Sequence, residues 1–156
     1  MKLSERLSAI TEFIAPGANV ADIGSDHGLV PVYLAVNNRA NRIIASDNSA
    51  DSLKAARRNA IKYNVESKIK FIVAPGLDGV GEDEVDTVVI AGLGGETIIS
   101  ILEDAPWMKK LGITLILQPQ TKLEDLGRWL RENEFEIICS KVVRDNKKLY
   151  TIFKVE

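Results

Sequence analysis

The amino-acid sequence predicts a doubly wound α/β fold, in which a mostly parallel, seven-stranded sheet is covered by helices and finished by an antiparallel C-terminal hairpin. Three observations lead to this expectation. Short apolar runs alternate with amphipathic segments, acids and glycines follow several of these runs, and the last two runs are joined by a polar turn without a helix. Strands that alternate with helices pair in parallel, whereas strands joined by a tight turn pair antiparallel.

The first elements in the chain are a helix, a strand and a second helix. Apolar residues recur at helical spacing over 4–14, and Pro16-Gly17 ends that pattern. The run 19–24 is apolar and ends in an acid and a glycine, which is typical of a strand that leads into a turn. The apolar stretch 29–37 then predicts a helix.

A second strand and helix repeat this arrangement. Residues 43–47 form an apolar run that closes on an acid, and Ser49 is a good N-cap for the helix that follows. Leu53 and Ala56 lie on the apolar side of this helix, and Asn64 is expected to end it.

Three further strands and two further helices complete the parallel part of the sheet. Apolar runs predict strands over 69–73, 87–90 and 114–117, and helical spacing of apolar residues predicts helices over 97–103 and 123–132.

The C-terminal end has a different pattern. Residues 135–143 and 149–155 both resemble strands, and the polar residues 144–147 between them predict a turn. No repeat or low-complexity linker interrupts the chain. We therefore expect residues 1–156 to form one domain.

Composition limits the classes of function. Lys and Arg total 20 against 22 Asp and Glu, so the net charge of -2 gives no overall attraction for polyanions, and any RNA must bind a local basic patch. A single Cys139 and a single His27 exclude an intramolecular disulfide and a Cys/His metal cluster, and no metal site is expected. No apolar run reaches the roughly 20 residues that span a bilayer. We expect a soluble, cytoplasmic protein without a membrane segment, of unknown oligomeric state.

The loop after the first strand carries the strongest chemical signal. It reads Asp22-Ile23-Gly24-Ser25-Asp26-His27-Gly28, and ligands bind at such carboxyl ends of parallel strands. A dinucleotide-binding loop has the pattern Gly-x-Gly-x-x-Gly, but Asp26 stands where its middle glycine would be. A carboxylate repels a pyrophosphate and tolerates a ligand with a sulfonium and an amino group, such as S-adenosylmethionine. The alternative is a turn that needs glycine only for its backbone angles.

Three other segments are expected to face the same site. Asp47 closes the second strand, where a carboxylate can accept two hydrogen bonds from a ribose diol, although an acid there also commonly precedes a helix. The run Ala91-Gly92-Leu93-Gly94-Gly95 lets a ligand approach bare backbone, unless it is only a flexible loop. The tripeptide Gln118-Pro119-Gln120 offers two amides that can pair with a base.

Together these segments resemble the bacterial tRNA (adenine(22)-N1)-methyltransferases, which occur mainly in Gram-positive bacteria. The resemblance covers nearly the whole chain and is carried by the loop 22–27, the glycine run 91–95, the segment 115–119, Ser4-Glu5-Arg6-Leu7 and Lys148-Leu149-Tyr150. It implies a class I, Rossmann-like fold that uses S-adenosylmethionine as cofactor and tRNA as partner.

The resemblance also implies roles for individual residues. It makes Asp26 the catalytic carboxylate, with His27 as its neighbour. Residues expected to hold the cofactor are Asp22, Gly24, Ser25, Gly28, Asp47, Asn48, Gly76, Leu77, Ala91 and Gly92. Residues expected to contact the substrate are Gly94, Gly95, Gln118, Pro119, Gln120, Arg144, Lys147 and Lys148.

The chain departs from the family pattern in three ways. Ala74-Pro75 stands where relatives have Gly-Asp, so a carboxylate for the cofactor's adenine is missing there. Gln120 replaces a common asparagine. The helical extension that relatives carry beyond the hairpin is absent, so we expect a minimal member of the family or a shortened chain.

The implied reaction is methylation of N1 of an adenine, whose lone pair is free only in an unpaired or flipped-out base. Asp26 would stabilise the positive charge that develops on the ring. Basic residues expected to contact RNA lie on the hairpin turn and, as a second choice, on the helix after Asp47, which carries Lys54, Arg57, Arg58 and Lys62.

Other functions remain open at this point. The same cofactor could serve another RNA position or a small molecule, and the chain could be a nucleotide-binding or RNA-binding module without catalytic activity. A nicotinamide-dependent oxidoreductase is disfavoured because the Gly-x-Gly-x-x-Gly pattern is absent.

Overall fold

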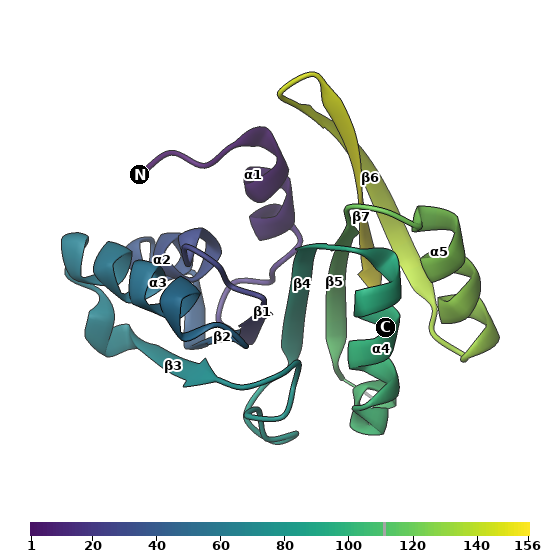
Figure 1. Cartoon of the computed structure of the whole chain (residues 1–156), viewed down its shortest axis with the longest axis horizontal. Coiled ribbons are helices and arrows are strands. Elements are labelled where there is room, and N and C mark those ends of the chain that lie inside the picture. Colours follow the sequence, from purple (N-terminus) through teal and green to yellow (C-terminus); the bar gives the residue numbers. More distant parts are fainter. Residues whose placement is uncertain (111) are drawn as a thin grey trace.

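The computed structural model describes residues 1–110 and 112–156, and over these residues it contains the expected mixed sheet (Figure 1). Its strands are β1 (Ala18–Ile23), β2 (Ala40–Asp47), β3 (Ile69–Val73), β4 (Thr87–Leu93), β5 (Thr114–Pro119), β6 (Ile137–Asp145) and β7 (Lys148–Val155). They lie in the order β3-β2-β1-β4-β5-β7-β6. The first five are parallel, and β7 pairs antiparallel with both β5 and β6. The predicted fold class is confirmed.

The helices also follow the sequence expectations closely. They are α1 (Glu5–Glu12), α2 (Leu29–Val36), α3 (Ala50–Lys62), α4 (Gly95–Glu103) and α5 (Leu123–Glu132). The Ser49 hydroxyl accepts a hydrogen bond from the Ser52 amide at 3.3 Å and caps α3 as expected. Two short 3₁₀ turns, η1 (Glu66–Lys68) and η2 (Pro106–Lys109), are not predicted by the sequence because three or four residues are too few to show a periodicity.

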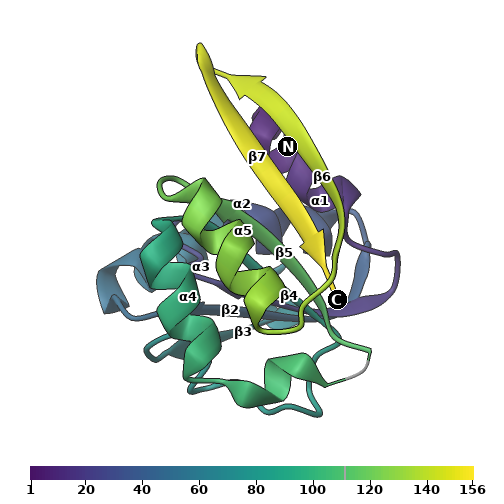
Figure 2. The same ribbon diagram turned by 90° about the vertical axis from the view of Figure 1, so that its right-hand side faces the viewer.

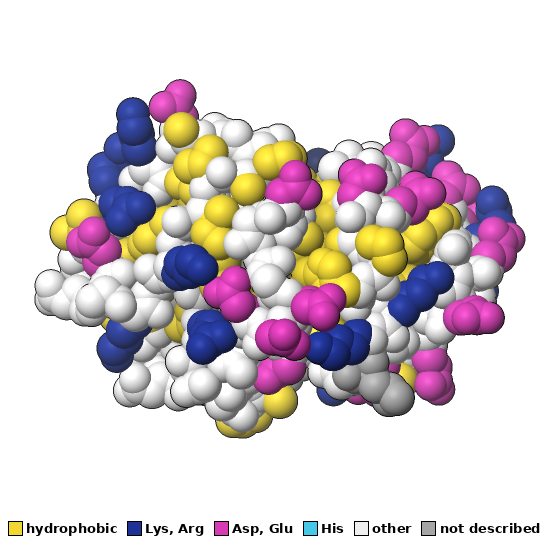
Figure 3. Space-filling view, turned by 90° about the horizontal axis from the view of Figure 1, so that it is seen from below, with side chains coloured by type: hydrophobic (Ala, Val, Ile, Leu, Met, Phe, Trp, Pro, Cys, Tyr) yellow, Lys and Arg dark blue, Asp and Glu magenta, His cyan; other side chains and the backbone are white. Residues whose placement is uncertain are grey.

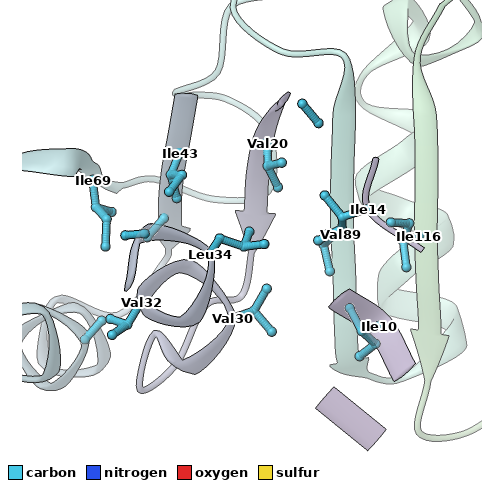
Figure 4. Packing of buried hydrophobic residues seen from close by; sticks show 14 of the residues in the cluster. Ile10, Ile14, Val20, Val30, Val32, Leu34, Ile43, Ile69, Val89 and Ile116 are labelled. Atoms are coloured by element: carbon cyan, nitrogen blue, oxygen red, sulfur yellow. The ribbon is translucent and has the colours of Figure 1, made fainter. Parts of the chain in front are cut away.

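Alternate residues of the central strands pack on opposite faces of the sheet. Val20 of β1 joins a cluster with residues of α1, α2 and α3, and the next residue, Ala21, joins a second cluster with residues of α4 and α5. Figure 4 shows the first cluster, in which Ile10 of α1 and Leu34 of α2 approach the sheet. Because both faces are buried, the central strands are mostly apolar, and polar residues such as Asp22 and Gln118 lie near their carboxyl ends.

The C-terminal hairpin projects beyond the rest of the molecule, and α1 lies beside it (Figures 1 and 2). Its turn is tighter than expected. Arg144 pairs with Leu149 and Asp145 with Lys148, so only two residues connect the strands. These residues, Asn146 and Lys147, have φ values of 50° and 67°, as a two-residue hairpin turn of type I′ requires. The polar residues 144 and 145 belong to β6 because this projecting strand does not need apolar side chains.

Candidate functional site

A cavity of about 1040 Å³ lies at the carboxyl ends of the parallel strands. It is bounded by the loops after β1, β2, β3, β4 and β5 and by one side of α4. The strand order reverses between β1 and β4, since β2 and β3 lie to one side of this pair and β5 to the other. Ligands of doubly wound folds bind at such a reversal, and the volume suits a nucleoside-sized ligand.

The structure brings most of the predicted site residues together in this cavity. Those that line it are Asp22, Gly24, Ser25, Asp26, His27, Asp47, Asn48, Gly76, Leu77, Ala91, Gly92 and Gln120. Those that do not are Gly28, Gly94, Gly95, Gln118, Pro119, Arg144, Lys147 and Lys148. The cavity therefore unites loops that are far apart in the sequence.

Backbone hydrogen bonds hold the loop after β1 against β2. The amides of Gly24 and Ser25 both donate to the carbonyl oxygen of Ser46, at 2.9 and 3.1 Å. Gly24 and Asp26 have φ values of 72° and 52°, so the loop turns sharply and presents the Asp26 side chain to solvent. The Asp26 carboxylate and His27 Nε2 lie 4.0 Å apart.

Asp47 connects the loops after β1 and β2. Its Oδ2 atom accepts a hydrogen bond from the Asp26 amide at 3.0 Å, and its Oδ1 atom accepts one from the Ser49 amide at 2.9 Å. Asp47 thus prepares the start of α3, as an acid before a helix does, and it also lines the cavity, where a ligand can reach it. Each carboxylate oxygen keeps one further lone pair for a ligand.

Asp22 is a buried acid at the floor of the cavity, 6% exposed. Its Oδ2 atom accepts a hydrogen bond from the Ser25 hydroxyl at 3.0 Å. Desolvation raises the pKa of Asp22 to about 7, against the lowering effect of the Ser25 hydrogen bond, while Asp47 raises it further and Arg6 lowers it. A cation bound beside Asp22 would favour the ionised carboxylate.

The raised pKa of Asp22 predicts a pH-dependent stability. Between about pH 4 and pH 7 the folded protein keeps a proton that the unfolded chain has released, so stability falls as the pH rises, by up to roughly 1.4 kcal/mol for each pH unit. Asp22→Asn should remove this dependence and be more stable than the parent above pH 7. Urea unfolding of both proteins from pH 4 to pH 8 measures the difference. A difference that stays constant over this range would contradict the assignment.

Three of the predicted glycines lie outside the cavity, and at two of them the structure shows why glycine is needed. A Cβ atom on Gly28 would lie 2.7 Å from Cβ of Ala56, where the start of α2 meets α3. A Cβ atom on Gly95 would lie 2.7 Å from the carbonyl oxygens of Thr121 and Lys122. Close packing therefore accounts for Gly28 and Gly95, and Gly94 is the N-cap of α4.

Arg6 is the main residue of the site that is not predicted from the sequence. It lines the cavity from α1, although its segment enters the sequence argument only through the family resemblance. Its Nη1 atom donates to Gln118 Oε1 at 2.7 Å. Gln118 itself is fully buried behind the cavity, whereas Gln120 faces it.

Polar residues of α4 and of the loop after β3 also line the cavity without being predicted from the sequence. Thr97, Ser100 and Asp104 line the cavity, and their helical spacing is a signal that could have identified them. Asp78 also lines it, three residues after Pro75. A carboxylate is thus available near the position where the family resemblance leads us to expect an acid.

The three hairpin cations lie apart from the cavity. Arg144, Lys147 and Lys148 are exposed near the tip of β6 and β7. Among residues 1–110 and 112–156, no group of three His, Cys, Asp or Glu side chains could hold a metal ion. No helix in the described part of the chain is both long and apolar enough to cross a membrane.

Comparisons with known proteins agree with this geometry. Residues 3–153 match the protein family described as "Methyltransferase domain". The chain is 33% identical over 156 residues to the tRNA (adenine(22)-N(1))-methyltransferase of Bacillus subtilis, and it is 32% identical over 139 residues to a Mycoplasma genitalium protein described as a tRNA methyltransferase. These matches span 100% and 88% of this chain but only 66% and 61% of the relatives.

Solved structures of methyltransferases are also similar to this chain. A Streptococcus pneumoniae protein in complex with S-adenosyl-L-methionine superposes with a TM-score of 0.93 at 32% identity, over 99% of this chain and 73% of that one. TrmK of M. capricolum in complex with S-adenosyl-homocysteine superposes with a TM-score of 0.88 at 28% identity, over 100% of this chain and 69% of that one. From the cavity and these similarities together, the chain belongs to the bacterial tRNA (adenine(22)-N1)-methyltransferase family.

Proposed function

We propose that this protein transfers a methyl group from S-adenosylmethionine to N1 of an adenine in tRNA, at the position numbered 22 in its relatives. The observation that carries the proposal is the cavity that joins Asp22, Asp47 and the glycine loops to the exposed carboxylate of Asp26. The B. subtilis relative is named for this reaction. Because tRNA is the proposed substrate, we also place the protein in the cytoplasm.

The donor and acceptor groups of the cavity fit S-adenosylmethionine. Asp47 keeps lone pairs that can accept hydrogen bonds from a ribose diol, and Asp78 can accept one from an adenine amino group. Asp22 provides a negative charge for the cationic methionine end of the cofactor once it ionises. Gly24 and Gly92, which have positive φ values, leave bare backbone at the wall.

The bound cofactor would supply an electrophilic methyl group, and the protein's own residues would position the base that receives it. Asp26 is 70% exposed at the cavity, so its carboxylate can approach a base that enters from solvent. Methylation at N1 leaves a positive charge on the adenine ring, and a fixed carboxylate stabilises that charge as it develops. The sharp turn at Asp26 and the hydrogen bond from its amide to Asp47 fix the backbone from which this carboxylate projects.

Two basic surfaces can hold the tRNA phosphates. The first is the hairpin tip with Arg144, Lys147 and Lys148. The second is α3, where Lys54, Arg57, Arg58 and Lys62 are exposed. In Figure 3, Lys and Arg side chains gather at the edge of the molecule where Figure 1 places α3, while acids are frequent towards the middle of that face. A polyanion is therefore expected to avoid the acidic middle of that face.

Calorimetry and a methyl-transfer assay test the proposal. S-adenosylmethionine and S-adenosylhomocysteine should each bind one site per chain, and Asp47→Ala should weaken binding by about 1–3 kcal/mol because the variant cannot make charge-assisted hydrogen bonds there. Labelled methyl groups should appear as 1-methyladenosine in tRNA. If the folded protein binds neither ligand at millimolar concentration, S-adenosylmethionine is not its cofactor. If methyl groups pass only to small molecules or to another base, N1 of adenine in tRNA is not its substrate.

The hairpin cations should control the salt dependence of tRNA binding. Replacing Arg144, Lys147 and Lys148 with glutamine should lower the slope of log affinity against log salt by up to about three units, roughly one for each phosphate that the hairpin no longer neutralises. Filter binding over a salt series measures the slope.

A matched triple variant controls for the change in net charge. Lys68, Lys70 and Lys110 donate to Asn38, Glu84 and Asp83 and lie outside the cavity lining. Their replacement with glutamine should leave the slope close to that of the parent. Equal slopes in all three proteins would show that the hairpin does not hold RNA.

A further inference from the structure

A hydrogen-bond relay runs from α1 to the loop after β5. Arg6 Nη1 donates to Gln118 Oε1 at 2.7 Å. Gln118 Nε2 in turn donates to the carbonyl oxygen of Pro119 at 2.9 Å and to Gln120 Oε1 at 3.1 Å. Gln118 is fully buried, while Arg6 and Gln120 line the cavity at the two ends of the relay.

The chemistry of the end groups determines the direction of every bond in the relay. A guanidinium group has only donors, so the oxygen of the Gln118 amide must face Arg6. The nitrogen of that amide then faces the Pro119 carbonyl, which can only accept. Because the same nitrogen also faces Gln120, Gln120 must present its oxygen to Gln118. The amide nitrogen of Gln120 remains outside the relay, with both of its donors available.

Arg6 is held in position by contacts with three separate elements. Besides its bond to Gln118 of β5, its backbone amide donates to Asp145 Oδ2 of β6 at 3.4 Å. Its guanidinium carbon lies 5.6 Å from the centre of the Tyr150 ring of β7, in cation–π geometry. The backbone contact fixes the position of Arg6 on α1, and the two guanidinium contacts direct its side chain towards Gln118.

We infer that Arg6 is a positioning residue that, through Gln118, makes Gln120 a hydrogen-bond donor towards the substrate base. This inference rests on the proposed function. With its amide oxygen turned to Gln118, Gln120 offers the base the two donors of its amide nitrogen, beside the donors of Arg6. This wall therefore fits a purine edge with an acceptor, which in adenine is N3 or N7. An exocyclic amino group facing this wall would meet another donor.

A hydrogen-bond acceptor lies on the other side of the cavity, at the same edge of the sheet. Asp26 follows β1 and is separated from the loop after β5 by β4. Its carboxylate only accepts, so the exocyclic amino group of adenine fits on that side. An acceptor at Asp26 for the amino group and donors at Gln120 for N3 or N7 allow two orientations of adenine, and both leave its N1 lone pair unoccupied.

Substrates that lack one ring nitrogen test the inference. Single-turnover methylation is measured on tRNA with adenosine, 7-deazaadenosine or 3-deazaadenosine at the target position. The parent should discriminate against one of the two analogues by at least about tenfold, because a donor of Gln120 is left unpaired. Gln120→Leu and Arg6→Met should methylate adenosine at least about tenfold more slowly and should show no such discrimination. The ratio between variants cancels the intrinsic reactivity of each analogue.

A conservative variant separates the relay from a merely structural role. Lysine also has only donors, so Arg6→Lys should retain the parent's discrimination while Arg6→Met does not. Binding of S-adenosylmethionine by Gln120→Leu should match the parent. The side-chain amide protons of Gln118 should exchange slowly in the parent and in Arg6→Lys, and measurably faster in Arg6→Met, a readout independent of turnover.

The outcomes separate this inference from the proposed function. A parent that fails to methylate adenosine-containing tRNA would overturn the proposed function, and the inference with it. A parent that methylates all three substrates equally, or an Arg6→Met variant with the parent's discrimination and unchanged Gln118 exchange, would overturn the inference alone.

Discussion

Gly28→Ala is expected to destabilise the protein by about 3 kcal/mol. The residue has a φ value of 69°, where a Cβ atom costs roughly 1 kcal/mol or more. That Cβ atom would also lie 2.7 Å from Cβ and 3.1 Å from Cα of Ala56. Side-chain rotation cannot relieve a collision with backbone, so α2 and α3 would have to separate, and overpacking of this kind costs about 1–3 kcal/mol.

Gly17→Ala is the matched control for the backbone effect. Gly17 has a φ value of 81°, but no atom lies within 4 Å of its Cβ position. This variant should be destabilised by only about 1 kcal/mol. Urea unfolding of both variants and the parent isolates the steric part, and equal destabilisation of the two variants would show that the collision with Ala56 is relieved without cost.

Asp26→Asn should lower the single-turnover rate of methyl transfer at least about tenfold, which corresponds to roughly 1.4 kcal/mol in the barrier. The substitution removes the negative charge and keeps the shape. Asparagine also tolerates the positive φ value of 52° at this position, so the loop after β1 should keep its conformation. Affinity for S-adenosylmethionine should therefore be nearly unchanged.

A charge-matched variant controls the measurement. Asp83 is 87% exposed, contacts Lys110 and lies outside the cavity lining. Asp83→Asn should methylate tRNA at the parent's rate. If Asp26→Asn also reacts at that rate, Asp26 is a binding or structural residue and the catalytic role implied by the family resemblance is wrong.

The fold and the floor of the site can be predicted from the sequence because those features depend on local patterns. Apolar runs with acids at their ends identify β1 and β2, and the carboxyl ends of neighbouring parallel strands must meet. Asp22 and Asp47 are therefore expected to face one cavity, as the structure shows. The change from alternating strands and helices to a polar turn is enough to predict the antiparallel hairpin.

Features that depend on distant contacts could not be predicted. Glycine at position 28 looks like part of the ligand loop, and only its distance from Ala56 shows that packing requires it. Gln118 and Gln120 look equivalent in sequence, but one is buried within β5 and the other follows the end of that strand and lines the cavity. Nothing in the local pattern shows what Arg6 does, since its partners Gln118, Asp145 and Tyr150 come from β5, β6 and β7.

The distance along the chain between Arg6 and its partners has a consequence for synthesis. Gln118 and Asp145 follow Arg6 by 112 and 139 residues. Pairings of such long range form late and slow the folding of a domain, and a growing chain exposes its first residues long before its last. A nascent chain that ends before β5 would already carry the acidic loops but would lack the donors of Gln120. We therefore expect the Gln118 relay to form only after β5 has been synthesised and has packed against α1.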